Sequence, residues 1–461
     1  MNERYITIAV VTIIDAPCGA GKTQWAIQEM NLHEEESYIY CTPFLAEVDR
    51  IKSNTKHGRF TEPEYYVVDE LTGEFINTTK LDSFETLLAS NKDIAVSHST
   101  FLNATPETIQ LIKDGEYTLI LDESLDAVQE FNNIQPVSAD CRQTMSGDDI
   151  NMLVENKIIT VGEYGKVTWC GHNRQPESKF REVERMAELG RLYLSRDKFL
   201  VAIFPPEMFS AFKKVYVLLY MIDAEILKYY FQLFGIEYDK ASIEKDADSY
   251  KLVPYNTEAD FQFRERCREL VHVCNEERLT ECKRSLSKSW FDKNSKRKPG
   301  EECGIDRLKK DVQSFYRTCV PSAKASHNDV MWTCPKDYKK RLAVAKYKIV
   351  RSISNEDKKE LSSEGIKHLE RKLDCFVPCN ARATNDFRER WALAYCCKLQ
   401  RNPYIDALFT DHGIPVDTDA YSLASLIQWI CRSRLRDGKP IELYLPSTQL
   451  RKLFLDWMNC K

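Results

Sequence analysis

The sequence predicts an α/β protein with two tandem domains, each built on a parallel sheet. Apolar, β-branched runs alternate with helix-like segments from residue 5 to about 125, and this is the order of strand–helix–strand units. A second set of such runs begins near residue 270 and continues towards the C-terminus. A polar, aperiodic segment from Asp246 to about Phe261 separates them. We therefore expect a first domain at 1–245, a linker at 246–265 and a second domain at 266–461.

Composition indicates a soluble chain without a membrane anchor. The 461 residues carry a formal net charge of −5, and 29% of them are charged. The apolar run Ile6–Ile14 is too short to span a bilayer and lacks a small-residue cleavage site, so we interpret it as a buried strand that belongs to a cytoplasmic protein. The sixteen cysteines lack paired metal-binding spacing. Buried thiols are favoured, with zinc binding by Cys274, Cys282, Cys303, Cys319 and Cys334 as the alternative.

A nucleotide-binding loop is predicted at Asp15–Trp25, "DAPCGAGKTQW". An apolar strand precedes it and a helix beginning near Lys22 follows it, which is the context that a phosphate-binding loop requires. Backbone N–H groups at such a turn cradle phosphates. Lys22 would reach the β- and γ-phosphates, and the Thr23 hydroxyl would bind Mg²⁺. The predicted nucleotide-binding residues are Ala16, Pro17, Cys18, Gly19, Ala20, Gly21, Lys22, Thr23 and Gln24.

Two carboxylates complete the predicted catalytic set of this domain. The apolar strand Tyr117–Leu121 ends in Asp122 and Glu123. Asp122 would hold the Mg²⁺ shell, and Glu123 would orient or deprotonate the attacking water. We therefore expect hydrolysis of a nucleoside triphosphate with Mg²⁺ rather than nucleotide binding alone.

These motifs resemble superfamily 2 helicases and translocases of the DEAD/DEAH type. The A-x-x-G-x-G-K-T loop and the Asp-Glu strand end carry the resemblance, which implies two RecA-like (P-loop NTPase) domains. "YIYCTPFLAEVDRI" at Tyr38–Ile51 is similar to motif Ia, and "DIAVSHSTF" at Asp93–Phe101 to the strand before the Asp-Glu strand. The third family motif, Ser-Ala-Thr, is replaced by Leu219-Tyr220-Met221.

The resemblance also implies a nucleic-acid path. Motifs IV and V correspond by order to "NDVMWTCPKDY" at Asn328–Tyr338 and "CFVPCNARATND" at Cys375–Asp386. The residues that the resemblance places along this path are Thr42, Pro43, Ser97, Thr333, Asn380, Arg382 and Thr384.

A polar stripe is predicted near the C-terminus. Gln428, Arg432 and Arg436 have the spacing i, i+4, i+8, which is one side of a continuous helix. Arginines placed so can stabilise the γ-phosphate charge in the transition state. The segment resembles family motif VI, and Arg434 competes with Arg436 for the second arginine role.

Residues from about 127 to 212 are predicted to be an insertion in the first domain, because the family's third motif normally follows the Asp-Glu strand closely. "EYGK" within Lys157–Cys170 predicts a hairpin turn, and Ser178–Leu194 predicts a helix. Two roles are open for this insertion. It could be a wedge or partner-binding surface, or it could be a structural buttress.

The segment Lys283–Arg351 is strongly basic. It has nineteen Lys/Arg and seven Asp/Glu, a local excess of twelve positive charges. Interleaved aromatic residues favour a single-stranded nucleic-acid path, with rings that stack on bases. These rings are Trp290, Phe291, Tyr316 and Trp332.

The sequence thus predicts an ATP-dependent helicase or translocase on DNA, with DNA favoured over RNA as the partner. The amino-acid sequences of these motifs resemble a helicase-like group of phages and mobile elements. This resemblance implies replication or mobile-element proteins as partners and localisation in the cytosol of a bacterial host. The first alternative is a nucleic-acid-stimulated ATPase that remodels or loads complexes without unwinding duplex. The second is a replication scaffold that holds ATP as a structural ligand.

Overall fold

The computed structural model of the protein describes residues 10–68, 75–133, 145–171, 180–247, 249–281, 283–296, 300, 302–320, 328–344, 366, 374–379 and 386–459. These residues form two compact units. Unit 1 comprises the described parts of 1–16, 20–256 and 401–416, and unit 2 those of 17–19, 257–400 and 417–461.

Unit 1 contains an eight-stranded sheet in the order β15-β14-β1-β13-β7-β2-β6-β3. Every neighbouring pair is parallel except β14 and β15, so the predicted α/β class is confirmed. The strands are β1 (Val10–Asp15), β2 (Tyr38–Thr42), β3 (Phe60–Thr61), β6 (Asp93–Ser97), β7 (Thr118–Asp122), β13 (Lys214–Leu219), β14 (Tyr238–Asp246) and β15 (Ser249–Pro254).

The edge strand β15 corrects two expectations. The sheet of the first domain is mixed rather than wholly parallel, because the two residues between β14 and β15 permit only an antiparallel return. The segment 246–265, expected to be a linker, contains the boundary between the two units after residue 256, but it also holds this strand and the start of helix α10 (Glu258–Leu270).

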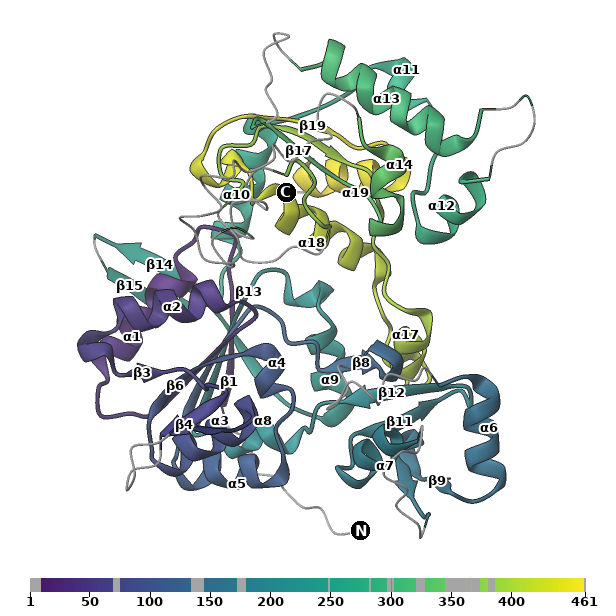
Figure 1. Ribbon diagram of the computed structural model, residues 1–461. Coiled ribbons are helices and arrows are strands. Elements are labelled where there is room, and N and C mark those ends of the chain that lie inside the picture. Colours follow the sequence, from purple (N-terminus) through teal and green to yellow (C-terminus); the bar gives the residue numbers. More distant parts are fainter. Residues whose placement is uncertain are drawn as a thin grey trace. The chain divides into compact units, whose positions relative to one another are not determined.

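Helices cover both faces of the sheet in unit 1 (Figure 1). α1 and α2 pack on one face through Trp25, Met30 and Ile51, next to Tyr40 of the sheet. The remaining helices pack on the other face, where alternate strand residues such as Leu119 point. The helices are α1 (Lys22–Leu32), α2 (Leu45–Asn54), α3 (Lys80–Ala89), α4 (His98–Phe101), α5 (Pro106–Asp114), α8 (Glu207–Ala211) and α9 (Ile226–Phe234).

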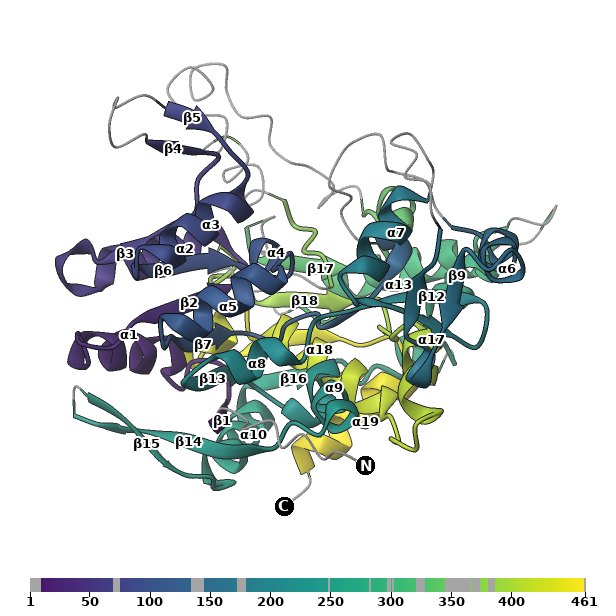
Figure 2. The same ribbon diagram turned by 90° about the horizontal axis from the view of Figure 1, so that it is seen from below.

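Two hairpins extend from this sheet and its helices. β4 (Tyr66–Val68) and β5 (Phe75–Asn77) form a short antiparallel pair beside α3, and β14 with β15 forms the longer one (Figure 2). Two hydrogen bonds join β15 to α1. The side-chain amide of Gln28 donates to the backbone carbonyl of Tyr250 and accepts from the backbone N–H of Tyr250, both at 2.9 Å.

The segment between β7 and β13 has its own sheet and core. The sheet order is β11-β12-β8, and the predicted "EYGK" hairpin is confirmed as the antiparallel pair β9 and β10. The predicted helix at 178–194 ends early, because Gly190 has a φ of +66° and the next residues pair with β12 as a strand. The elements are β8 (Val128–Glu130), α6 (Gly147–Glu155), β9 (Ile159–Val161), β10 (Val167–Trp169), α7 (Arg181–Glu188), β11 (Leu192–Ser195) and β12 (Phe199–Ile203).

Residues 401–416 belong to unit 1 and include helix α17 (Pro403–Thr410). Arg401 is buried, with its guanidinium over the Tyr229 ring at 5.1 Å. It donates to the Ala224 carbonyl at 3.0 Å and to Asp406 at 2.8 Å. At the other end of α17, Asp411 accepts two hydrogen bonds from the exposed Arg196.

Unit 2 is built on four parallel strands in the order β16-β19-β18-β17. The second set of strands predicted from near residue 270 towards the C-terminus is confirmed. The strands are β16 (Val271–Val273), β17 (Val330–Thr333), β18 (Ala392–Tyr395) and β19 (Ile441–Tyr444). The helices besides α10 are α11 (Glu277–Thr280), α12 (Lys288–Asn294), α13 (Gly304–Thr318), α14 (Lys339–Leu342), α18 (Thr418–Ile430) and α19 (Thr448–Asn459).

Within the described part of the chain, every helix is too short or too polar to cross a lipid bilayer.

We predict that Arg401→Ala loosens α17 much more than Arg196→Ala does. Removing Arg401 leaves Asp406 and the Ala224 carbonyl without a buried donor, a loss of roughly 2–3 kcal/mol. The exposed Arg196–Asp411 pair is worth at most about 1 kcal/mol. Hydrogen exchange of the amides in Pro403–Thr410 measures the difference. Equal protection in the two variants would contradict the role given to Arg401.

Candidate nucleotide-binding site

The predicted strand, turn and helix of the nucleotide loop are confirmed. β1 ends at Asp15 and α1 begins at Lys22. Between them, Gly19 has a φ of +84° and Gly21 a φ of +97°, conformations that only glycine adopts easily. The Lys22 ammonium donates to the Ala16 carbonyl, so it lies over the turn where phosphates would bind.

Tyr250 of β15 closes one side of this turn. A Cβ atom added at Gly21 would lie 2.1 Å from the Tyr250 ring. Gly21 is therefore required twice, by its positive φ and by the ring beside it. The sequence does not predict this contact, because the polar segment around Tyr250 predicts a linker.

Asp122 is a buried carboxyl group at the end of β7. It accepts a hydrogen bond from the Tyr40 hydroxyl at 2.9 Å. Burial, with smaller contributions from Glu123 and Glu47, raises the pKa of Asp122 to about 7, and the Tyr40 hydrogen bond and the Lys22 charge lower it in part. A cation next to this carboxyl group would favour its ionised form, as expected of a magnesium ligand.

Glu123 is held in an unusual conformation directly after Asp122. Its φ is +67°, and its N–H donates to the Leu218 carbonyl at 2.9 Å. His98 contacts the Asp122 carbonyl oxygen through Nε2 at 3.0 Å. The Glu123 side chain is only half-buried. This turn thus fixes the Glu123 backbone and leaves its carboxylate within reach of water.

Sheet topology brings Lys22, Asp122 and Glu123 to one edge. The carboxyl ends of parallel strands lie together, and β13 separates β1 from β7. The glycine turn, the ammonium of Lys22, the half-buried Thr23 and the carboxyl group of Asp122 fit the requirements of ATP with Mg²⁺. Among the described residues, no group of three or more His, Cys, Asp or Glu side chains could hold a metal ion by itself.

Asp15 is a further residue of the site that sequence reasoning missed. Its carboxylate accepts from the N–H groups of Met221 at 2.7 Å and Ile222 at 3.3 Å. It thereby ties the start of the nucleotide loop to the turn after β13. That turn holds Leu219 and Tyr220, which are buried, and Met221, which has a φ of +63°.

The structure corrects the expected nucleic-acid contacts of the strand-end threonines. Thr42 and Thr333 have no exposed surface, so their side chains do not face a polymer. Ser97 caps α4, accepting from the Thr100 N–H at 3.4 Å, and it shares a hydrogen bond with Ser99. Pro43 is half-buried. The remaining predicted contacts, Asn380, Arg382 and Thr384, lie outside the described residues.

The expected helical stripe of Gln428, Arg432 and Arg436 is wrong in its geometry. Gln428 lies on α18, but this helix ends at Ile430. The Ser433 hydroxyl donates to the Ile430 carbonyl and accepts from the Leu435 N–H, which starts a separate short 3₁₀ turn at Arg434–Asp437. Arg432 is buried after the helix, and Arg436 is in the 3₁₀ turn.

Arg434 has a structural place within unit 2. Its guanidinium lies over the Trp391 ring at 5.2 Å, and its Nε donates to the Pro440 carbonyl at 2.6 Å. It is therefore a weaker candidate for the second arginine role than Arg436.

The aromatic residues of the basic segment are core residues. Phe291, Tyr316 and Trp332 are buried in the core of unit 2, and Trp290 packs edge-on against Phe291. The expectation that these rings stack on nucleic-acid bases is therefore wrong for the three buried ones. Exposed lysines such as Lys288 and Lys293 of α12 keep a positive surface there.

Comparisons with known proteins match two parts of this chain to domains of one family. Residues 265–458 match the family described as the YonV C-terminal Rossmann-like domain, and residues 142–202 match the YonV middle domain. The SPbeta prophage-derived protein YonV of Bacillus subtilis (strain 168) is 33% identical over 457 residues, which cover 97% of this chain and 98% of that protein.

Solved structures of low similarity include Xpd4 of S. tokodaii, with a TM-score of 0.46 and 11% identity over 97% of this chain and 94% of that chain. The DUF1998 helicase MrfA bound to DNA has a TM-score of 0.31 and 9% identity, over 97% of this chain and 49% of that chain. The relative that matches over nearly its whole length, together with the two domain matches, shows that this chain belongs to the YonV family.

Proposed function

We propose that the protein is an ATP-dependent helicase or translocase on DNA. One observation carries the ATPase part of this proposal: the parallel sheet of unit 1 brings the glycine turn, Lys22, Asp122 and Glu123 to the same edge. The electrostatic influence of Lys22 on the buried Asp122 supports their proximity. A strand and glycine turn that bind no nucleotide would not require two acidic residues, Asp122 and Glu123, at the same end of the sheet.

Each residue has a defined chemical role in the proposed hydrolysis. The turn N–H groups and Lys22 bind the phosphates, while Thr23 and ionised Asp122 hold Mg²⁺. When bound, Mg²⁺ would neutralise the charge that develops on the phosphate oxygens. Glu123 orients the attacking water and accepts its proton. Arg432 and Arg436 are proposed to stabilise the transition-state charge, as in the family that the sequence resembles.

The DNA part of the proposal has separate support. The full-length relative is prophage-derived, which supports a role for this chain in DNA metabolism. The basic segment presents exposed cations, a requirement for binding the phosphate backbone.

One observation favours the alternative of an ATPase that remodels complexes without unwinding. The turn at Leu219–Met221 replaces the family's Ser-Ala-Thr motif, is largely buried, and is tied to Asp15. A turn fixed in this way lacks the serine and threonine side chains of that motif, so it would not connect hydrolysis with strand movement as the motif does.

Lys22→Ala should lower the ATP turnover of the full chain by at least about 100-fold, because the phosphates lose their charged partner. Glu123→Gln should keep ATP binding but lose turnover to a similar degree. Phosphate release and binding of a fluorescent ATP analogue measure the two properties. Lys56→Ala removes an exposed lysine that pairs with Glu34 and is the matched control. Full turnover by Lys22→Ala would exclude the proposed site.

Asp122→Asn should stabilise the ligand-free protein at pH 8 by roughly 2–4 kcal/mol. The folded pKa of about 7 lies above the ordinary value of 3.8, so wild-type stability falls as pH rises from about 4 to 7 and then levels off. The advantage of the variant should shrink to about 1 kcal/mol near pH 4.5. Urea unfolding at both pH values measures it. If the variant is no more stable than the wild type, or if its advantage is larger in acid, the raised pKa of Asp122 is contradicted.

Activity on polymers separates the two functions. The helicase proposal predicts that single-stranded DNA raises the ATPase rate and that a fluorescent fork is separated only with hydrolysable ATP. Turnover stimulated by DNA without strand separation would support the remodelling ATPase. Stimulation by RNA alone would overturn the assignment of DNA as the partner.

A further inference from the structure

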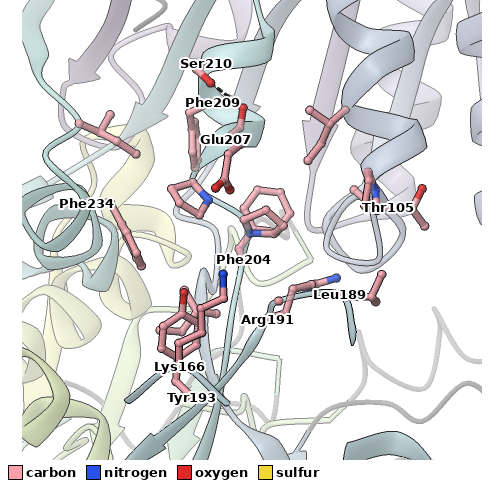
Figure 3. A pocket seen from close by; sticks show the side chains of 18 residues that line it. Thr105, Lys166, Leu189, Arg191, Tyr193, Phe204, Glu207, Phe209, Ser210 and Phe234 are labelled. Atoms are coloured by element: carbon pink, nitrogen blue, oxygen red, sulfur yellow. Dashed lines mark hydrogen bonds between the residues drawn. The ribbon is translucent and has the colours of Figure 1, made fainter. Parts of the chain in front are cut away.

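Unit 1 contains a cavity of about 500 Å³ where the inserted segment meets the core domain (Figure 3). Its volume is in the range of small-molecule sites. One wall comes from the start of α5, the chain between β12 and α8, and the end of α9. The other wall comes from the turn before β10 and from the start of β11. The apolar lining residues include Ile109, Phe204, Pro205, Phe209, Phe234 and Ile236.

A buried arginine lines this mainly apolar space. Arg191 is only 6% exposed, and its Nη2 donates to the Leu102 carbonyl. Its Nε and Nη1 have no hydrogen-bond partner and no contact with solvent. Burying donors of a charged group without acceptors is costly. Burial, together with the charge of Arg185, lowers the pKa of Arg191 to about 10, so the group is still a cation near neutral pH.

Two exposed charges complete the electrostatics of the cavity. Figure 3 shows the Lys166 ammonium and the Glu207 carboxylate extending into the space from opposite sides. Lys166 and Arg191 are on the wall formed by the segment from β8 to β12, and Glu207 is on α8, which follows that segment and packs into the core of the main sheet. One end of the cavity is therefore positive. The carboxylate opposite disfavours a second negative charge on anything bound between them.

We propose that this cavity binds a small amphipathic monocarboxylate. Its carboxylate would lie at Arg191 and Lys166, and its apolar body would lie against Phe204, Phe209 and Phe234. A carboxylate fits because it is an acceptor with two oxygens and one charge. The Nε and Nη1 donors of Arg191 have no acceptor in the free protein, and the proposal requires the guanidinium to turn these donors towards the bound carboxylate. This site is independent of the proposed ATPase, because it lies away from the nucleotide loop residues and shares none of them.

The test uses the full chain with three probes that share a phenyl ring. These are 4-phenylbutyrate, its neutral amide, and phenyl phosphate. Calorimetry and thermal unfolding measure binding without ATP. We expect 4-phenylbutyrate to bind and to raise the Tm, and the amide to bind at least about 10-fold more weakly. Arg191→Met should weaken 4-phenylbutyrate at least about 10-fold, and Lys166→Gln should weaken it severalfold.

Arg196→Gln is the matched control, because it removes an exposed arginine of the same segment that pairs with Asp411 outside the cavity. It should leave binding unchanged. The proposal would be overturned if the acid and its amide bind equally or if neither binds. It would also be overturned if the Arg191→Met and Lys166→Gln variants bind 4-phenylbutyrate as tightly as the wild type does. Tighter binding of phenyl phosphate would also overturn it, in favour of a phosphate ester. Lys166 is exposed, so its variant keeps the test valid if Arg191→Met does not fold.

Discussion

The hydrogen bond from Tyr40 to Asp122 is the interaction on which the candidate site depends. A carboxyl group at the buried end of β7 is poorly solvated, and the pKa of about 7 reflects this. The parallel register between β2 and β7 aligns Tyr40 with Ile120, two residues before the carboxyl group. Asp122 therefore has a partner before any ligand binds, and its backbone carbonyl has another in His98. This arrangement fixes the position of Glu123, which follows directly.

Local sequence patterns were sufficient for the elements that have a strong signal of their own. The apolar strand, the glycine turn and Lys22 predict β1 and α1, because glycine at positive φ has a direct physical cause. The strand β15 had no such signal. It lies at the sheet edge, pairs only with β14, and keeps most of its side chains partly in solvent, so Ser249–Pro254 has no apolar run. The sequence therefore does not predict the position of Tyr250 or its contact with Gly21.

Spacing alone was also insufficient for the arginines and the aromatic rings. The stripe of Gln428, Arg432 and Arg436 required a helix that continues past Ile430, and no glycine or proline marks its end. A hydroxyl–backbone hydrogen bond from Ser433 to the Ile430 carbonyl ends it instead, a local competition with the helix that residue spacing does not reveal. Rings between lysines are equally expected for an amphipathic helix. In α13, Tyr316 faces the core while charged residues face solvent, so the basic segment and its aromatic residues have separate roles.

The strand β13 connects the two sites of unit 1. The cavity residue Phe209 is in α8, shortly before β13 begins, and the other end of β13 leads to the turn that Asp15 holds. β13 pairs with β1 at six positions and with β7 at five. A one-residue slip of a strand paired on both sides would turn every buried side chain to the wrong face. Such a strand has no second arrangement to adopt, and coupling between distant sites requires one. A ligand in the cavity should therefore stabilise the inserted segment against the core without changing the geometry of the nucleotide loop.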